Sequence, residues 1–282
     1  MLLKIILTII VIAAIIVLVT FVYGAVSHYS TVDYSMNLLK NPRDLKNSQN
    51  SGSIPKILNQ TYHKPENIPD KVRENIKKFA SDYEIKMYND GEGIEFIKKY
   101  FIDRVAEKYD SLTGAHKADL LRYCLLYING GIYADIKTEF TEPLSSLVQY
   151  SDSVSNKPLI YIVNSLHNPK TVYNGFMAAP ANQKFFLDLI NFIVQKSSLL
   201  PAFFYTYFIK DVYQKLTNDL VDGNVKQGFN TGKRNDFYVF EEVTSTNTEN
   251  CPDGLDRYKL CSWIMDSEKK RIKTRYSDYP WH

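Results

Sequence analysis

The stretch from Lys117 to Glu139, KADLLRYCLLYINGGIYADIKTE, decides the fold because it joins an apolar helix to a strand through a sharp turn. The helix is predicted over Thr113–Ile128, and the Asn-Gly-Gly that follows is a typical signal for a helix end. Asp119 and Arg122 lie three residues apart on this helix, so their side chains share a face. An acid and a permanent cation can therefore point together.

The strand after the turn is predicted over Ile132–Phe140, with Asp135, Lys137 and Glu139 alternating onto one face. Open α/β sheets bind ligands beyond the carboxyl ends of their strands, and these charges appear where the strand leaves its apolar start. Together with the helix pair, they suit a polyanionic ligand that carries hydroxyl groups, or a divalent metal. The spacing alone slightly favours a plainer interpretation, in which the helix pair is an internal salt bridge and the strand end is solvated.

Strands and helices alternate along the rest of the folded part. Further strands are predicted at Ile54–Tyr62, Tyr83–Tyr88, Leu159–Val163 and Gly175–Ala179, and further helices at Asp70–Ala80, Ile94–Tyr109, Gln183–Lys196 and Ala202–Leu216. This alternation predicts an α/β fold with a mostly parallel sheet flanked by helices.

The N-terminal part has a different character. Ile5–Tyr23 contains no charged residue, Pro or Gly, and is long enough to cross a bilayer as a helix. A cleaved signal peptide ending near Gly24-Ala25 is the alternative. We expect a transmembrane anchor over 1–24, a polar stem or linker over 25–53 and the folded domain over 54–282. Lys4 favours a single-pass protein whose N-terminus is cytoplasmic and whose folded domain is lumenal or external.

Composition and charge exclude several classes of protein. The 282 residues carry 34 Lys and Arg against 31 Asp and Glu, and this net charge of +3 argues against a nucleic-acid partner. A hydrophobic content of 45% excludes a disordered chain, and three cysteines exclude a disulfide framework. The sequence leaves open whether Cys251 and Cys261 are bonded to each other.

Two runs, IPKILNQTY from Ile54 and HKADLLRY…YINGGIYADIK from His116, resemble the family 32 glycosyltransferases, a group with a DXD motif that includes yeast outer-chain and sphingolipid mannosyltransferases. Weaker similarity continues through 174–178, 231–232 and 274–276. The resemblance implies a GT-A-like fold and a type II membrane topology. It also implies an enzyme that moves a sugar, with retention, from a UDP- or GDP-sugar to a glycan, glycolipid or glycoprotein acceptor.

The resemblance also assigns roles to particular residues. Asp119 and Arg122 match a helical Asp-x-x-Arg that grips the donor sugar, and Asp135 matches the first Asp of the DXD motif. The complete set of donor-binding residues implied in this way is Gln60, Thr61, Asp119, Arg122, Asp135 and Asn174.

The chain departs from the family pattern at three positions. Asn59 and Tyr62 replace a His and a Trp around the Gln-Thr of the first strand. The second Asp of the DXD motif, which normally binds Mn²⁺ or Mg²⁺, is Lys137, and an ammonium group cannot be a metal ligand.

Three outcomes follow from this third replacement. A metal is held by Asp135 with help from Glu139 or His282, or Lys137 itself neutralises the diphosphate and joins the catalytic group. In the third outcome catalysis is lost, and the chain is a non-catalytic module that binds a sugar or nucleotide-sugar.

Overall fold

The computed structural model describes residues 38–41, 52–149, 156–166, 170–195, 201–245, 261–267 and 269–276. The predicted transmembrane segment, most of the predicted stem, Cys251 and His282 lie outside these ranges. None of the helices within these ranges combines the length and the apolar character needed to cross a membrane. The description below concerns the unit Ser35–His282.

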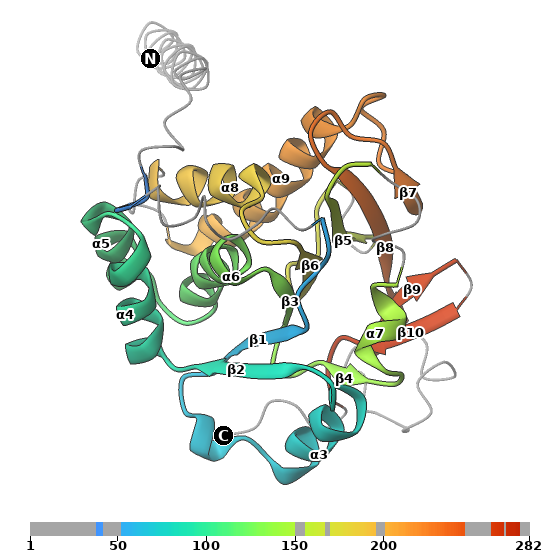
Figure 1. Ribbon diagram of the computed structural model, residues 1–282, viewed down its shortest axis with the longest axis horizontal. Coiled ribbons are helices and arrows are strands. Elements are labelled where there is room, and N and C mark those ends of the chain that lie inside the picture. Colours follow the sequence, from blue (N-terminus) through green and yellow to red (C-terminus); the bar gives the residue numbers. More distant parts are fainter. Residues whose placement is uncertain are drawn as a thin grey trace, which may run out of the picture. The chain divides into compact units, whose positions relative to one another are not determined.

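A mixed sheet runs through this unit (Figure 1). Its strands are β1 Ile57–Thr61, β2 Glu84–Tyr88, β3 Gly131–Ala134, β4 Glu139–Phe140, β5 Leu159–Ser165, β6 Phe176–Ala179, β7 Gly228–Asn230, β8 Asp236–Ser245, β9 Cys261–Asp266 and β10 Lys269–Lys273. The order is β2-β1-β3-β6-β5-β8-β9-β10-β4, with β7 also paired to β8.

The α/β class is confirmed, but the prediction of a mostly parallel sheet is wrong. Parallel pairing joins β1 to β2, β1 to β3 and β5 to β8. The other pairs are antiparallel, including β3 with β6 and the run β8-β9-β10. The physical reason lies in the connections. A parallel pair needs a long crossover, whereas the described connection from β7 to β8 is too short for one.

The sheet is strongly curled. In the strand order β3 is third and β4 is last, six strand spacings away. At about 4.8 Å per spacing, a flat sheet would separate the two by roughly 29 Å. The chain from Ala134 to Glu139 takes five residue steps, which reach at most about 18 Å. The last strand, β4, must therefore curl back toward β3, the third strand of the order.

The predicted strand Ile132–Phe140 is also wrong in its second half. The strand ends at Ala134, the chain turns through Ile136 and Lys137, and β4 begins at Glu139. The reason is that β4 pairs with β10, the strand before it in the sheet order, and not with the strands beside β3. The chain must therefore turn away from β3 before β4 begins. Asp135, Lys137 and Glu139 therefore do not share one strand face.

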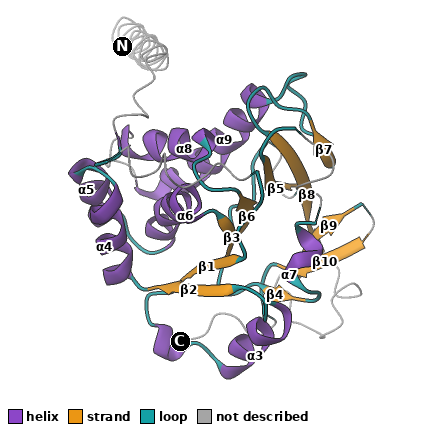
Figure 2. Ribbon diagram, in the orientation of Figure 1, coloured by secondary structure: helices purple, strands orange, loops and turns teal. Residues whose placement is uncertain are grey.

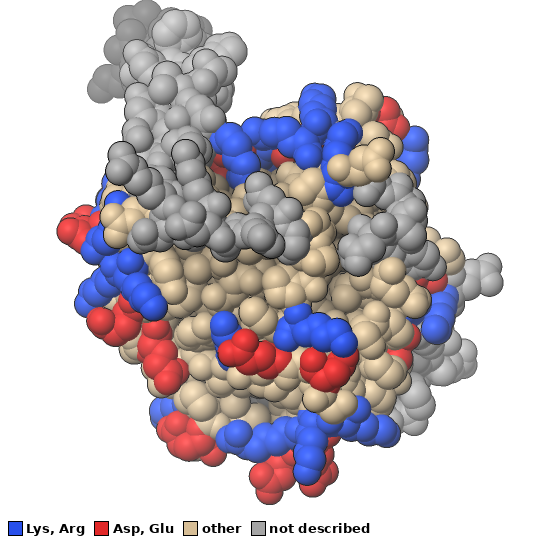
Figure 3. Space-filling view, viewed as in Figure 1, with Lys and Arg blue, Asp and Glu red and all other residues tan. Residues whose placement is uncertain are grey.

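Helices cover both faces of the sheet (Figure 2). They are α3 Asp70–Phe79, α4 Asp90–Tyr100, α5 Asp103–Ser111, α6 Ala115–Asn129, α7 Leu144–Leu147, α8 Lys184–Gln195 and α9 Pro201–Asp219, with a 3₁₀ turn at Pro65–Asn67. The larger core lies between one face and α4, α5, α6, α8 and α9, and the smaller core lies against α3 and α7. Figure 3 shows basic and acidic side chains side by side along the edges and in one central group of a face whose other described residues are mostly uncharged.

The single helix predicted over Ile94–Tyr109 is two helices. α4 starts earlier, at Asp90, because Asn89 and Glu92 form a capping box. The Glu92 amide donates to Asn89 Oδ1, and the Asn89 amide donates to Glu92 Oε2, both at 2.9 Å. The sequence Asn-Asp-Gly, which looks like a turn, is thus a helix start. α4 ends before Phe101, whose backbone is extended, and α5 begins at Asp103.

Part of the predicted stem packs on this break between α4 and α5. Leu38 and Leu39 are 4% and 8% exposed, and Leu39 forms a β-bridge with Phe101. The Ile102 amide donates to the Leu38 carbonyl at 2.9 Å, and Lys40 lies 3.1 Å from Asp103. The contacts of the folded unit therefore extend into the segment predicted to be a linker.

Candidate functional site

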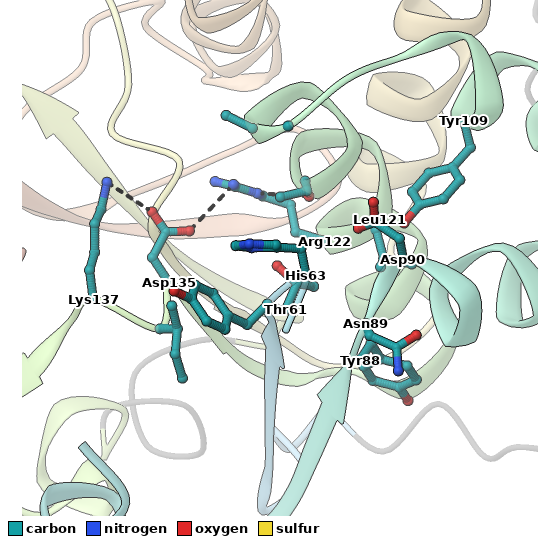
Figure 4. A pocket seen from close by; sticks show the side chains of 15 residues that line it. Thr61, His63, Tyr88, Asn89, Asp90, Tyr109, Leu121, Arg122, Asp135 and Lys137 are labelled. Atoms are coloured by element: carbon teal, nitrogen blue, oxygen red, sulfur yellow. Dashed lines mark hydrogen bonds and ion pairs between the residues drawn. The ribbon is translucent and has the colours of Figure 1, made fainter. Parts of the chain in front are cut away.

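A pocket of about 320 Å³ lies at the carboxyl ends of β1, β2 and β3 and against α6. These three strands are parallel, so their carboxyl ends meet at one edge of the sheet. Figure 4 shows side chains from all three strand ends and from the helix around this space. The lining residues are Thr61, Tyr62, His63, Tyr88, Asn89, Asp90, Tyr109, Gly114, Ala115, Ala118, Leu121, Arg122, Asp135, Ile136 and Lys137.

Arg122 is the buried cation of the pocket lining, at 4% exposure. Its Nη2 lies 3.3 Å from Asp119 Oδ1 and 3.4 Å from Asp135 Oδ1. Nη1 donates to the Asn174 carbonyl, and the guanidinium lies 4.7 Å from the centre of the Tyr133 ring. Burial alone would lower the pKa of Arg122, but these neighbours raise it above its ordinary value. The guanidinium is therefore charged and held on several sides.

Asp135 follows β3 and contacts three polar groups, one of which is Arg122. Its Oδ1 also accepts from the Tyr133 hydroxyl at 3.2 Å, and its Oδ2 lies 3.5 Å from Lys137 Nζ. The Tyr133 hydroxyl is in turn 3.0 Å from Thr61 Oγ1. Burial alone would raise the pKa of Asp135, but Arg122, Lys137 and the tyrosine bond lower it. The carboxylate is thus ionised and fixed between two cations.

Asp119 lies on α6 one turn before Arg122 and is 2% exposed. Its Oδ1 pairs with Arg122, while its Oδ2 lies 3.7 Å from His116 Nδ1. Within the described part of the chain, Oδ2 accepts no hydrogen bond. A buried carboxylate oxygen in this state is costly, and a ligand hydroxyl would relieve that cost.

The structure therefore places Thr61, Asp119, Arg122, Asp135 and Lys137 in or beside this one pocket. The internal Asp119–Arg122 salt bridge of the plainer interpretation is also present, and Arg122, one of its two partners, lines the pocket.

Gln60 and Asn174 are placed differently from the residues around the pocket. Gln60 is fully buried and does not line the pocket, because side chains alternate along β1 and Thr61 takes that face. The side chain of Asn174 is buried, and only its carbonyl reaches Arg122.

Of the residues predicted to hold a metal, Asp135 lines the pocket but Glu139 does not. Glu139 Oε2 pairs with Lys273 at 3.0 Å, and Glu139 lines a separate cleft against α3. His282 lies outside the described residues. No group of three or more His, Cys, Asp or Glu side chains in the described ranges could hold a metal. Among the residues that the structure describes, those at the carboxyl end of β3 therefore do not fit a divalent cation.

His63, Asn89 and Asp90 line the pocket and were not predicted to do so. His63 and Asn89 follow the carboxyl ends of β1 and β2 directly or within two residues. That position after a strand, rather than the residue type, is the signal that could have identified them.

Comparisons with known proteins point to the same region of the chain. Residues 65–154 match the family model described as "Glycosyltransferase sugar-binding region containing DXD motif". Over 195 residues the chain is 27% identical to inositol phosphoceramide mannosyltransferase 3 of Schizosaccharomyces pombe, covering 66% of this chain and 49% of that protein. It is 30% identical over 144 residues to mannosyl phosphorylinositol ceramide synthase SUR1 of Saccharomyces cerevisiae, covering 49% of this chain and 34% of that protein.

Among solved structures, PaToxG glycosyltransferase aligns at a TM-score of 0.39 and 15% identity, covering 58% of this chain and 69% of that one. The chain spans about half or less of the length of these curated relatives. The sequence matches confirm the resemblance to the family 32 glycosyltransferases.

Proposed function

We propose that this chain is a membrane-anchored glycosyltransferase of GT-A-like fold, which moves a sugar from a nucleotide-sugar donor to an acceptor hydroxyl. The observation that carries the proposal is the buried cluster of Asp119, Arg122 and Asp135, in which Arg122 and Asp135 line the pocket and Asp119 lies behind them, paired with Arg122. All three residues fall in the region that matches the sugar-binding family model. A fixed cation between two carboxylates offers both donors and acceptors to the hydroxyl groups of a sugar.

The donor would be held by groups with complementary chemistry. Asp119 Oδ2, a buried acceptor, suits a donor-sugar hydroxyl, and Arg122 can donate to the same sugar. Tyr62 and His63, whose rings are 4.8 Å apart, offer aromatic surface for a nucleobase beside Thr61. Two relatives are named an inositol phosphoceramide mannosyltransferase and a mannosyl phosphorylinositol ceramide synthase. Mannose is therefore the first donor sugar to test.

The proposed transfer retains the configuration of the sugar. The acceptor hydroxyl approaches the anomeric carbon from the side of the leaving group, and its oxygen bonds to that carbon. The bond from the carbon to the phosphate oxygen breaks, and the nucleoside diphosphate leaves with the electron pair and receives the hydroxyl proton. The protein's contribution is to orient the sugar and to stabilise the developing negative charge.

Donor turnover tests this function. We expect the full chain, purified in detergent, to hydrolyse or transfer one sugar from a panel of UDP- and GDP-sugars that includes mannose, and to release the nucleoside diphosphate. If no donor is turned over but UDP or GDP still binds by calorimetry, the chain is a non-catalytic binding module. If neither is observed, the proposed function is wrong.

Membrane anchoring is a separate prediction from the uncharged segment Ile5–Tyr23. We expect the full chain to remain in membranes after extraction with alkaline carbonate. In sealed vesicles, residues beyond Ala25 should be protected from added protease, as the charge of Lys4 favours. Recovery of a soluble chain that starts near Ala25 would show a cleaved signal peptide instead.

A further inference from the structure

The carboxyl end of β3 carries one carboxylate where a DXD motif carries two, because Lys137 stands in the second position. The remaining carboxylate, Asp135, lies 3.4 Å from Arg122 Nη2 and 3.5 Å from Lys137 Nζ. Figure 4 shows both of these cations joined to Asp135 by dashed lines. A divalent cation bound to Asp135 would meet two fixed positive charges, and both would repel it.

We propose that the Lys137 ammonium takes the place of the metal and neutralises the donor diphosphate, so that this chain binds its donor without a divalent cation. The inference rests on the proposed function, because it concerns the diphosphate of the same donor. It departs from what the DXD name of the matching family model suggests for this position.

The backbone fixes Lys137 at the pocket. Its carbonyl accepts from the Tyr276 amide at 3.0 Å, and the neighbouring Thr138 amide donates to the Asp135 carbonyl at 2.9 Å. The side chain lines the pocket and is 32% exposed. A positioned, partly covered ammonium interacts more strongly with a diphosphate than a freely moving surface lysine does, since less side-chain entropy is lost on binding.

The turn that places Lys137 also removes the alternative metal ligand. After this turn Glu139 enters β4, where its carboxylate pairs with Lys273 in the separate cleft against α3. Lys137 and Glu139 are two residues apart in sequence, but only Lys137 lines the pocket. The fold therefore presents a cation, and no second carboxylate from this segment, to the donor.

During transfer, the bond between the anomeric carbon and the phosphate oxygen breaks and its electron pair stays on the diphosphate. The acceptor oxygen forms the new bond to the carbon, and its proton passes to the leaving phosphate oxygen. Lys137 keeps its own protons throughout and stabilises the negative charge on that oxygen, which is the task a metal ion performs elsewhere.

Binding of UDP and GDP to the full chain, measured by calorimetry in EDTA and again with Mn²⁺, tests the inference independently of turnover. For the nucleotide that binds, we expect the wild-type dissociation constant to be the same in both conditions. Lys137→Gln, which keeps a side chain of similar length without charge, should weaken binding by at least about tenfold. Lys137→Asp should bind weakly in EDTA and recover when Mn²⁺ is added.

The matched control is Lys226→Gln, because Lys226 is an exposed lysine that pairs with Asp222 outside the pocket. It should bind the nucleotide as the wild type does. Wild-type binding that weakens tenfold or more in EDTA would overturn the inference, as would wild-type affinity in Lys137→Gln. Absence of binding by either nucleotide in every condition would instead refute the proposed function, and the inference with it.

Discussion

Arg122→Ala is expected to reduce kcat/KM for sugar transfer by at least about 100-fold, the loss typical when one preorganised electrostatic group is removed from a catalytic site. The guanidinium contacts Asp119, Asp135 and the Asn174 carbonyl together. Its removal leaves two buried carboxylates without their common counter-charge, which also costs about 3–5 kcal/mol of stability. Steady-state kinetics and denaturant unfolding of the same preparation would measure both effects.

Arg271→Ala is the matched control for this loss. Arg271 is also buried, at 6% exposure, and its guanidinium contacts Glu142, Asp266 and the Ser146 carbonyl outside the pocket. The control should lose comparable stability but retain kcat/KM in its folded fraction. If the two variants lose transfer equally per folded molecule, Arg122 has a structural role only.

Gly131→Ala is expected to destabilise the chain by more than about 3 kcal/mol. Gly131 begins β3 at φ +84°, where an L-residue is strained by roughly 1–3 kcal/mol. A Cβ atom at this position would also clash with the Ile57 carbonyl oxygen. This is a backbone atom of β1, and it cannot move aside without breaking the strand pairing. The free energy of unfolding from urea denaturation is the measurement.

Gly223→Ala separates the two causes. Gly223 has φ +70°, but a Cβ there would meet its nearest neighbour only at 3.9 Å. This variant should lose only the cost of the backbone conformation, about 1–2 kcal/mol. Equal losses in the two variants would show that the approach of β3 to β1 does not constrain Gly131.

The part of the fold that the sequence predicted well is the part with a strong local signal. The apolar run before Gly130 gave α6 to within two residues, and the two glycines marked the start of β3. The charged residues after Ala134 occur at every second position, as in a strand with one polar face. A turn accommodates the same spacing. What ends β3 is the pairing of Phe140 with Ile272, far along the chain, and no local pattern reports such a partner.

Some residues of the candidate site could likewise be identified from a local pattern, and others could not. Asp119 and Arg122 were identifiable because helical spacing places them on one face. Gln60 and Thr61 could not be separated by motif alone, since the alternation along β1 sends one to each side of the sheet. Asn89 and Asp90 were missed because their place in the pocket depends on the register of β2 against β1.

The curled sheet sets the order in which the protein can be completed on the ribosome. The turn that carries Lys137 is held by the Tyr276 amide and by the pairing of β4 with β10, so it waits for a segment 276 − 137 = 139 residues later. At about 5–20 residues per second, translation of that interval takes roughly 7–28 s. The walls formed by β1, β3 and α6 can assemble during this time, whereas the end of the pocket that carries Lys137 is held only when the C-terminal hairpin arrives. Nascent chains therefore acquire the wall that carries Arg122 before Lys137 is held in place.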